Sequence, residues 1–395
     1  MPQSVPHTQK LYTKTFWILC ISYAFFGGSF NMIIPELPSF LSALGGEDYK
    51  GLIIALFTLT AGLSRPFSGK LTDLIGRKPI IIIGTIVCII CSLLYPILTT
   101  ISGFMLLRLV HGFSTGFSPT AMTAYIADIV PEHRRGEAMG IIGVSINLGS
   151  SISPPLGSYL ATHHSLNMMF YASSLFAVIS FLLVWNIKET IAAPKPFKPK
   201  MLVLQRDEII SKQAILPALV CGLSYLGFGA IITITPDQSE FLGITNKGLY
   251  FSSFTLCSIL SRLVAGQVSD RYGRIIVMKV AVALLALAYL CFGYAESPSW
   301  LLAGSGFIGF SLGIAMPAVF AWTVDRSNDS NRGKSMATLF IGLEIAIGTG
   351  ALIGAAIYDN DPSNFKRVFQ VVSVITIFAI LFVKERKSNL TIPTS

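Results

Sequence analysis

The sequence predicts an all-α membrane protein with twelve transmembrane helices in two pseudo-symmetric six-helix halves. Apolar runs of about 20 residues, the length that spans a bilayer, recur from one end of the chain to the other. The same charged and glycine-rich motifs also occur twice along the chain. Only 12% of the residues are charged and 52% are hydrophobic, whereas about 25% charged is usual for a soluble protein. So few charges are not expected to cover a water-facing surface.

Each apolar run is expected to be a helix, because every backbone polar group in lipid needs a partner within the structure. The first run is longer than the core of a signal peptide, and no small-residue cleavage site follows it, so we expect it to be retained. The predicted spans are 15–38, 50–70, 79–99, 102–126, 137–161, 167–186, 214–236, 247–267, 275–295, 299–322, 334–357 and 366–384.

The basic residues are unevenly distributed between the two sides of the predicted membrane. If the amino terminus is cytoplasmic, most of the 29 Lys and Arg residues fall in cytoplasmic tails and loops. The exceptions are Lys50, Lys247, Lys366 and Arg367 on the outer side and Arg65, Arg108 and Arg262 within helices. This pattern follows the positive-inside rule and predicts that both termini are cytoplasmic. It accounts for the net charge of +9 without a nucleic-acid partner.

The two halves repeat one another at a constant offset in residue number. Asp73 corresponds to Asp270, Asp128 to Asp325 and Gly157 to Gly354. We therefore expect an N-terminal half over residues 1–187, a Pro- and Lys-rich cytoplasmic linker over 188–212, and a C-terminal half over 213–395. Parallel six-helix repeats are typical of transporters in which one half rocks against the other around a site near the midplane.

Several motifs resemble those of one transporter family. "GKLTDLIGRK" resembles the helix 2–3 loop signature of the major facilitator superfamily, and "LRLVHGFSTG" resembles its helix 4 motif. "GSSISPPLGS" resembles the helix 5 motif of its proton-coupled antiporters, with Ser153 and Ser158 in place of two glycines. "NMIIPELPSFL" in helix 1 resembles the drug:proton exporters. The resemblance covers nearly the whole chain and implies a twelve-helix secondary transporter.

In that family the helix 2–3 motif forms a cytoplasmic gate. The resemblance implies that Asp73 faces the N-terminus of helix 11, near Gly333, where the helix dipole favours negative charge. Arg77 is placed to pair with Asp128, and the repeat predicts the same for Arg274 and Asp325. A basic anchor with a tight turn is the alternative. The predicted gate residues are Gly69, Asp73, Gly76, Arg77, Asp128, Gly266, Asp270, Gly273, Arg274 and Asp325.

Helix 5 carries the second motif with a family role. Pro154 and Pro155 remove two backbone donors and are expected to kink the helix. Gly149 and Gly157 allow close contact with a facing helix. The resemblance implies a bend that controls leak and direction, and an ordinary kinked helix is the alternative.

Glu344 is the first candidate for proton coupling. It lies ten positions from Lys334, about 15 Å into helix 11 at the helical rise of about 1.5 Å per residue. Ionisable groups inside a membrane are costly and are functional candidates. Its repeat counterpart is Asn147, which predicts a carboxylate and an amide facing one another near the midplane. A buried structural glutamate bonded to a neighbouring helix is the alternative.

Glu36, His111 and Asp237 are further candidates for proton coupling, and Arg108 for the substrate cavity. Arg108 is expected to meet Glu36 or a substrate anion, or to form a structural ion pair. His111 titrates near neutral pH or is a satisfied polar contact. Glu36 and Asp237 are expected to belong either to a gate or to the proton-coupling site. Arg65 and Arg262 are expected to snorkel to the cytoplasmic interface.

The remaining predicted cavity residues are polar or aromatic side chains of the helices. They are Asn31, Tyr125, Asn147, Tyr225, Phe228, Gln238 and Trp322. All six cysteines lie in apolar helices, so we expect them to pack as small apolar residues without a disulfide, a zinc site or another cofactor.

The resemblance implies proton-coupled export of a small organic molecule or drug by alternating access. The partners expected are substrate, protons and lipid, for a monomer in a bacterial inner membrane. Proton-coupled import of a sugar, organic anion or other metabolite is the alternative function. No nucleotide motif has the context that ATP binding needs. A polytopic membrane enzyme or a non-transporting receptor is a further class, but "THHSLN", the one candidate for an enzyme site, has no carboxylate beside its histidines.

Overall fold

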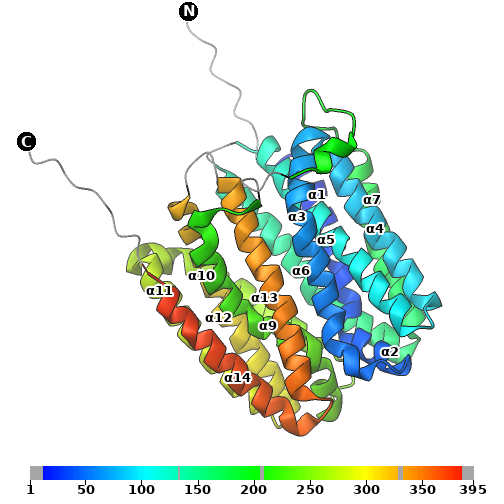
Figure 1. Cartoon of the computed structure of the whole chain (residues 1–395), viewed down its shortest axis with the longest axis vertical. Coiled ribbons are helices and arrows are strands. Elements are labelled where there is room, and N and C mark those ends of the chain that lie inside the picture. Colours follow the sequence, from blue (N-terminus) through cyan, green and yellow to red (C-terminus); the bar gives the residue numbers. More distant parts are fainter. Residues whose placement is uncertain (1–11, 132–133, 205–208, 328–331, 385–395) are drawn as a thin grey trace, which may run out of the picture.

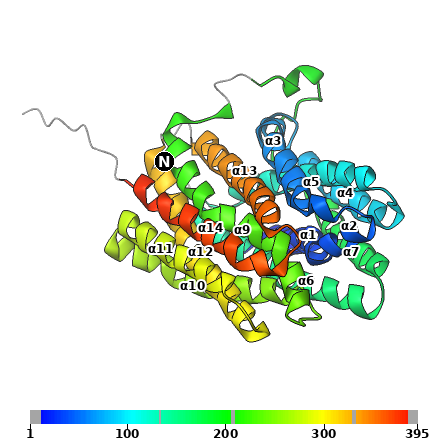
Figure 2. The ribbon, with the colours of Figure 1, turned by 60° about the horizontal axis from the view of Figure 1, so that its bottom comes forward.

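The computed structural model describes residues 12–131, 134–204, 209–327 and 332–384 of the 395-residue chain, and the described part is built from helices. Figure 1 shows two bundles side by side, one of α1–α7 and one of α9–α14, and Figure 2 shows the same separation from a second direction. We call them the N-half and the C-half. The boundaries of the two halves with the linker, at residues 187 and 213, remain predictions from the sequence.

The helices of the N-half follow the six predicted spans. Within the first span, the 3-10 turn Ile34–Glu36 separates two helices, and Pro35 and Pro38 sit at the start of the turn and of the second helix. The bounds are α1 Lys14–Ile33, α2 Leu37–Ala43, α3 Lys50–Leu74, α4 Arg77–Leu94, α5 Ile101–Ile129, α6 Arg135–His163 and α7 Leu166–Trp185.

The C-half also follows six predicted spans, and several of its helices run a few residues beyond the apolar core. The bounds are α9 Ile215–Phe241, α10 Leu249–Tyr272, α11 Arg274–Gly293, α12 Pro298–Arg326, α13 Arg332–Tyr358 and α14 Phe365–Phe378. Among the described residues, nine helical segments are long and apolar enough to cross a membrane. The helices α5, α6 and α10 are not among these nine segments. Together their sequences contain arginine, proline and serine residues, which make them less apolar.

Small residues set the close helix contacts within each half. A Cβ added at Gly149 or Gly157 on α6 would stand 2.0 or 2.2 Å from the backbone oxygen of Ala24 or Met32 on α1. In the C-half, a Cβ at Gly350 on α13 would stand 1.8 Å from the backbone oxygen of Leu226 on α9. Side chains larger than hydrogen would push these helices apart, which explains the glycines of the helix 5 motif. The helix α6 itself is unbroken through Pro154 and Pro155.

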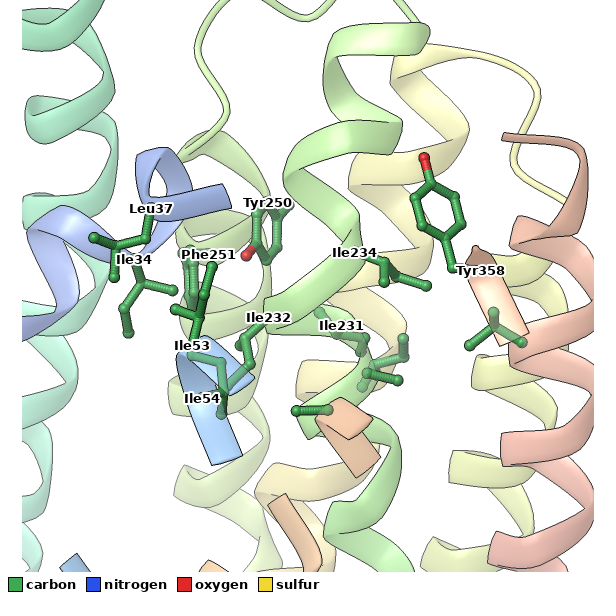
Figure 3. Close-up of a cluster of buried hydrophobic side chains, with 14 of the residues drawn as sticks. Ile34, Leu37, Ile53, Ile54, Ile231, Ile232, Ile234, Tyr250, Phe251 and Tyr358 are labelled. Carbon is green, nitrogen blue, oxygen red and sulfur yellow. The ribbon is translucent and has the colours of Figure 1, made fainter. Parts of the chain in front are cut away.

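The halves meet along α3 with α13 and along α6 with α10. At the end away from the 188–212 linker, buried apolar side chains from both halves form one cluster. Figure 3 shows Ile34, Leu37, Ile53 and Ile54 of the N-half beside Ile232 and Phe251 of the C-half. We call the end with the 188–212 segment the linker side and the other end the opposite side. This cluster seals the opposite side between the halves.

Candidate functional site

A cavity of about 850 Å³ lies between the halves. Its walls come from α1, α3, α5 and α6 of the N-half and from α9 and α13 of the C-half. The lining reaches the linker side at Lys70, Asp73, Leu204 and Lys334, and it ends at Ile54 and Ile232 in the sealed cluster of Figure 3. Its volume is in the range of ligand pockets, which is about 300–1,000 Å³. The cavity is therefore accessible from the linker side.

An ion pair joins the halves inside this cavity. Arg65 on α3 donates from Nη2 to Oε1 of Glu344 on α13 at 2.6 Å, with 15% and 11% of the two side chains exposed. The Arg65 guanidinium also lies over the Phe340 ring, 4.9 Å from its centroid. Gly62, one turn before Arg65, leaves room for the Glu344 side chain, because a Cβ there would stand 3.3 Å from Glu344 Cβ. Both charges are thus matched across the interface rather than within one helix.

This contact corrects the prediction for Arg65, which does not snorkel to the interface but pairs with the intramembrane glutamate. Of these two residues, the sequence indicates a functional role for Glu344 alone, because it is a carboxylate within an apolar span. The repeat pointed to Asn147 as its counterpart, yet Asn147 is not among the lining residues and its buried Nδ2 has no partner in the described structure. Arg262, the repeat counterpart of Arg65, also lies outside the lining and has a buried Nε without a partner.

Arg108 lines the cavity from α5 and is only 1% exposed. Its Nε donates to the backbone oxygen of Ile53 at 2.7 Å, and its Nη1 donates to the Tyr95 hydroxyl at 3.2 Å. The guanidinium lies 4.5 Å from the centroid of the Phe57 ring. Within the described ranges, no carboxylate forms an ion pair with it. The predicted pairing with Glu36 is absent, because Glu36 bonds elsewhere.

His111 lies one turn after Arg108 and is fully buried in the N-half, away from the cavity lining. Its two ring nitrogens lie 3.4 Å from Cys88 Sγ and 3.3 Å from the Tyr95 hydroxyl. These contacts agree with a satisfied polar group. The structure does not bring His111 to the same site as Glu344.

Glu36 and Asp237 lie toward the opposite side, outside the cavity lining. Glu36 is buried and accepts a hydrogen bond from Ser158 Oγ at 2.6 Å, so the serine of the helix 5 motif has a specific partner. Asp237 on α9 pairs with Lys50 on α3 at 2.5 Å, and 16% and 13% of the two side chains are exposed. Asp237 therefore joins the two halves where they are closed.

Of the other predicted cavity residues, Asn31 and Phe228 line the cavity. Asn31 Nδ2 donates to Ser150 Oγ at 3.0 Å and thereby links α1 to α6. Tyr125 instead donates to the backbone oxygen of Lys188 at 2.6 Å and fixes the start of the linker. Outside the lining are Tyr125, Asn147, Tyr225, Gln238 and Trp322. Aromatic character alone does not say which face of a helix a side chain occupies.

The linker-side motif of the N-half forms a compact network. Arg77 donates from Nε to Asp128 Oδ2 at 3.0 Å and from Nη1 to Asp73 Oδ1 at 2.8 Å. This confirms the pairing predicted for Arg77 and Asp128. Gly76 has a φ of +131°, which a residue with a side chain would strain to adopt. Gly69 lines the cavity at the same end.

Glu189, which the sequence analysis did not single out, completes this network. Its carboxylate accepts from the backbone N–H groups of Arg77 and Lys78, both at 3.0 Å, and so caps the start of α4. Partial burial by itself raises the pKa of Glu189, but the backbone hydrogen bonds from Ile191, Arg77, Lys78 and Thr190 outweigh it, and the pKa lies below the ordinary value of 4.5. A linker carboxylate thus holds the motif loop in place.

In the C-half, Arg274 bonds to Asp325 as predicted, and Gly273 has a φ of +85°. The contacts of Gly266, Asp270 and Gly333 fall outside the described part of the structure. In the described structure the ion pairs of Asp73, Arg77 and Arg274 on the linker side stay within one half.

The opposite side is closed by polar contacts between the halves as well as by the apolar cluster. Besides Lys50–Asp237, Asn246 Nδ2 donates to the Pro155 oxygen at 3.0 Å and Ser252 Oγ donates to the Ser151 oxygen at 2.6 Å. A Cβ added at Gly248 would stand 2.2 Å from the Pro154 carbonyl carbon. The two prolines of α6 therefore carry the closed contact with the C-half.

Comparisons with known proteins agree with this architecture. The family model described as Major Facilitator Superfamily matches residues 19–241 and 217–394. Proteins named "Multidrug resistance protein MdtG" from Salmonella typhi and from Salmonella typhimurium are each 28% identical over 401 residues, which cover 96% of this chain and 96% of each relative.

Solved structures resemble the chain at lower identity, which shows the fold alone. The human organic anion transporter MFSD10 has a TM-score of 0.72 at 19% identity and covers 94% of this chain and 99% of that one. A D-xylose-proton symporter has a TM-score of 0.77 at 15% identity, with 94% and 96% covered. With the family model matched over both halves, the chain belongs to the Major Facilitator Superfamily, as a multi-pass membrane transporter of small molecules.

Proposed function

We propose that this transporter is a proton-coupled exporter of small organic molecules that works by alternating access. The observation that carries the proposal is the Arg65–Glu344 ion pair, which lies in the cavity and joins the two halves. A carboxylate at this place can be discharged by a proton, and its discharge weakens a contact that both halves share. The likeness to relatives named for multidrug resistance favours export.

In the proposed cycle, the described arrangement takes up substrate from the linker side, which we place in the cytoplasm. Glu344 is ionised there and paired with Arg65. The halves then rock, Lys50–Asp237 separates and the linker-side networks of Arg77 and Arg274 come together as a gate. A proton from outside neutralises Glu344 while substrate leaves, and the return of the halves carries that proton inward.

We place the protein in a bacterial inner membrane with both termini in the cytoplasm. The basic residues of the tails and of the 188–212 linker support this orientation. A single chain encloses the whole cavity, so we propose that the monomer is the functional unit.

Retention of loaded compounds in a host that lacks its own pumps tests the proposal. Wild type is expected to lower the retention of some dyes or antibiotics, and both a protonophore and Glu344→Gln are expected to abolish this effect. Glu296→Gln changes an exposed loop carboxylate and serves as the matched control. Accumulation of a compound in place of loss would replace the exporter with an importer, and export by Glu344→Gln would move coupling to another residue.

A further inference from the structure

The charges that line the cavity do not balance. Its carboxylates among the described residues are Asp73 and Glu344, and both are paired, with Arg77 and with Arg65. Arg108 and Lys334 also line it, and neither forms an ion pair with a carboxylate that the structure describes. Among the described lining residues, no carboxylate is therefore uncommitted, and positive charge is in excess.

Arg108 is the deepest of these charges. At 1% exposure it is removed from water, and a buried cation is costly unless it is paired. Its protein partners are a backbone oxygen, a hydroxyl and an aromatic face, none of which carries a full negative charge. A guanidinium has five N–H donors, and only two hydrogen bonds to it are present within the described ranges. A side chain that lines the cavity therefore has unused N–H donors.

Aromatic side chains contribute to the wall of the cavity. The lining includes the rings of Tyr23, Phe30, Phe57, Phe228 and Phe340. Phe57 stacks on Arg108 and lies two turns from Arg65 on α3, a separation of about 12 Å at helical rise. Arg65 keeps a second, unpartnered donor at its buried Nε. These rings give the cavity an aromatic wall that also carries two guanidinium groups.

From this charge balance we infer that the cavity binds aromatic organic anions, with the anionic group held by Arg108 and the ring system against Phe57 and Phe30. The inference rests on the proposed transport function and names its substrate class. Arg–carboxylate contacts are short and frequently bidentate, so a carboxylate supplies the charge and the acceptors that Arg108 lacks. Among the described lining residues a cationic ligand finds no equivalent partner, because Glu344 is paired with Arg65 and Asp73 with Arg77.

Equilibrium binding to the purified full-length chain tests the inference without any proton gradient. The protein is placed in phosphatidylcholine nanodiscs, so that no anionic lipid headgroup competes. Three probes of one ring system are titrated by calorimetry: 1-naphthoate, 1-naphthamide and 1-naphthylmethylammonium. A hydrogen bond to a charged group is worth about 1.5–3 kcal/mol. Naphthoate is therefore expected to bind about tenfold or more tightly than the neutral and cationic probes.

Arg108→Gln is expected to make the three affinities equal, and Arg108→Lys is expected to keep part of the preference because it keeps the charge. Arg262→Gln is the matched control: it removes a helical arginine that also has an unpartnered Nε but lies outside the lining, and it is expected to leave the ranking unchanged. Thermal unfolding shows which variants are folded. If Arg108→Gln does not fold, the relative affinities of the three probes for the wild type still test the inference.

Naphthoate binding no tighter than the other two probes, including no binding at all, would overturn the inference. So would a folded Arg108→Gln that still prefers naphthoate. Failure of the two proposals is distinguishable. A chain that binds naphthoate but exports nothing loses the exporter function alone, whereas one that exports cationic dyes without an anion preference loses the anion site alone.

Discussion

Arg65 and Glu344 form an ion pair that joins the two halves inside the cavity. An unpaired charge of either residue would cost free energy inside a membrane, and the ion pair gives each charge a partner within the cavity. The sequence indicates a functional role for Glu344, because it is the one carboxylate within its apolar helix. It did not predict the partner, because no spacing rule connects helices from different halves. Partners within one half, such as Arg77 and Asp128, could be predicted from the motifs and the repeat.

Removal of one member of this pair is expected to destabilise the protein more than removal of both. Arg65→Gln leaves Glu344 without its partner, so each single variant should lose stability, and Arg65→Gln/Glu344→Gln should recover a coupling energy of about 1–3 kcal/mol. Thermal unfolding of the purified variants at one pH measures this cycle. Additive effects of the two substitutions would show that the contact contributes nothing to stability.

Glu189 gives a pH-dependent prediction at the same scale. Its pKa is lowered in the folded state, so its stabilising effect is complete above pH 4.5 and is lost as the pH falls through the lowered value. Glu189→Gln is expected to cost about 1 kcal/mol at neutral pH, as for other helix caps. The difference from wild type should shrink below pH 4.5. Glu296→Gln is the control, and a pH-independent cost for Glu189→Gln would contradict the account.

At the scale of elements, hydropathy and small residues account for most of what the sequence predicted. Apolar runs located the helices, because lipid leaves the backbone no alternative. The turn at Ile34–Glu36 was not predicted, although its prolines were visible. Hydropathy also could not say which face of α5 or α12 meets the cavity, and so Tyr125 and Trp322 were placed there while they bond or pack elsewhere.

The contact of α10 with α6 is expected to control opening of the opposite side. Gly248→Ala places a Cβ against the Pro154 backbone, and such overpacking costs about 1–3 kcal/mol in the closed arrangement. Spin labels at Tyr49 and Phe241, with Cys257 and Cys291 replaced by serine, should show a larger population of long distances. Gly143→Ala on α6, where a Cβ would meet nothing within 4 Å, is the control. An unchanged distance distribution would contradict this role.

At the scale of the whole molecule, the chain is sealed on the opposite side and accessible on the linker side. The two-half plan could be predicted from the internal repeat, because matched motifs imply matched helices. The side on which the cavity opens could not be predicted, because no spacing in the sequence says which ends of the two halves are in contact. The three-dimensional contacts, such as Lys50–Asp237, show it.

Loss of the Lys50–Asp237 pair is expected to move the population toward opening on the opposite side. Asp237→Asn removes the charge that Lys50 meets across the halves, whereas Glu240→Gln removes a Lys247 partner within the C-half. The spin-label pair at Tyr49 and Phe241 should lengthen in the first variant, with a shift of at least about threefold in the open-to-closed ratio, equivalent to about 0.6 kcal/mol. Equal effects of the two variants would contradict a specific latch.

We propose that a proton moves against substrate through Glu344. The most direct measurement uses proteoliposomes that contain a trapped pH dye and a compound which wild type exports from cells. An imposed gradient of that compound is expected to drive an opposite flow of protons in wild type and none in Glu344→Gln. Substrate movement without any proton flow in wild type, or an unchanged proton flow in Glu344→Gln, would contradict the account.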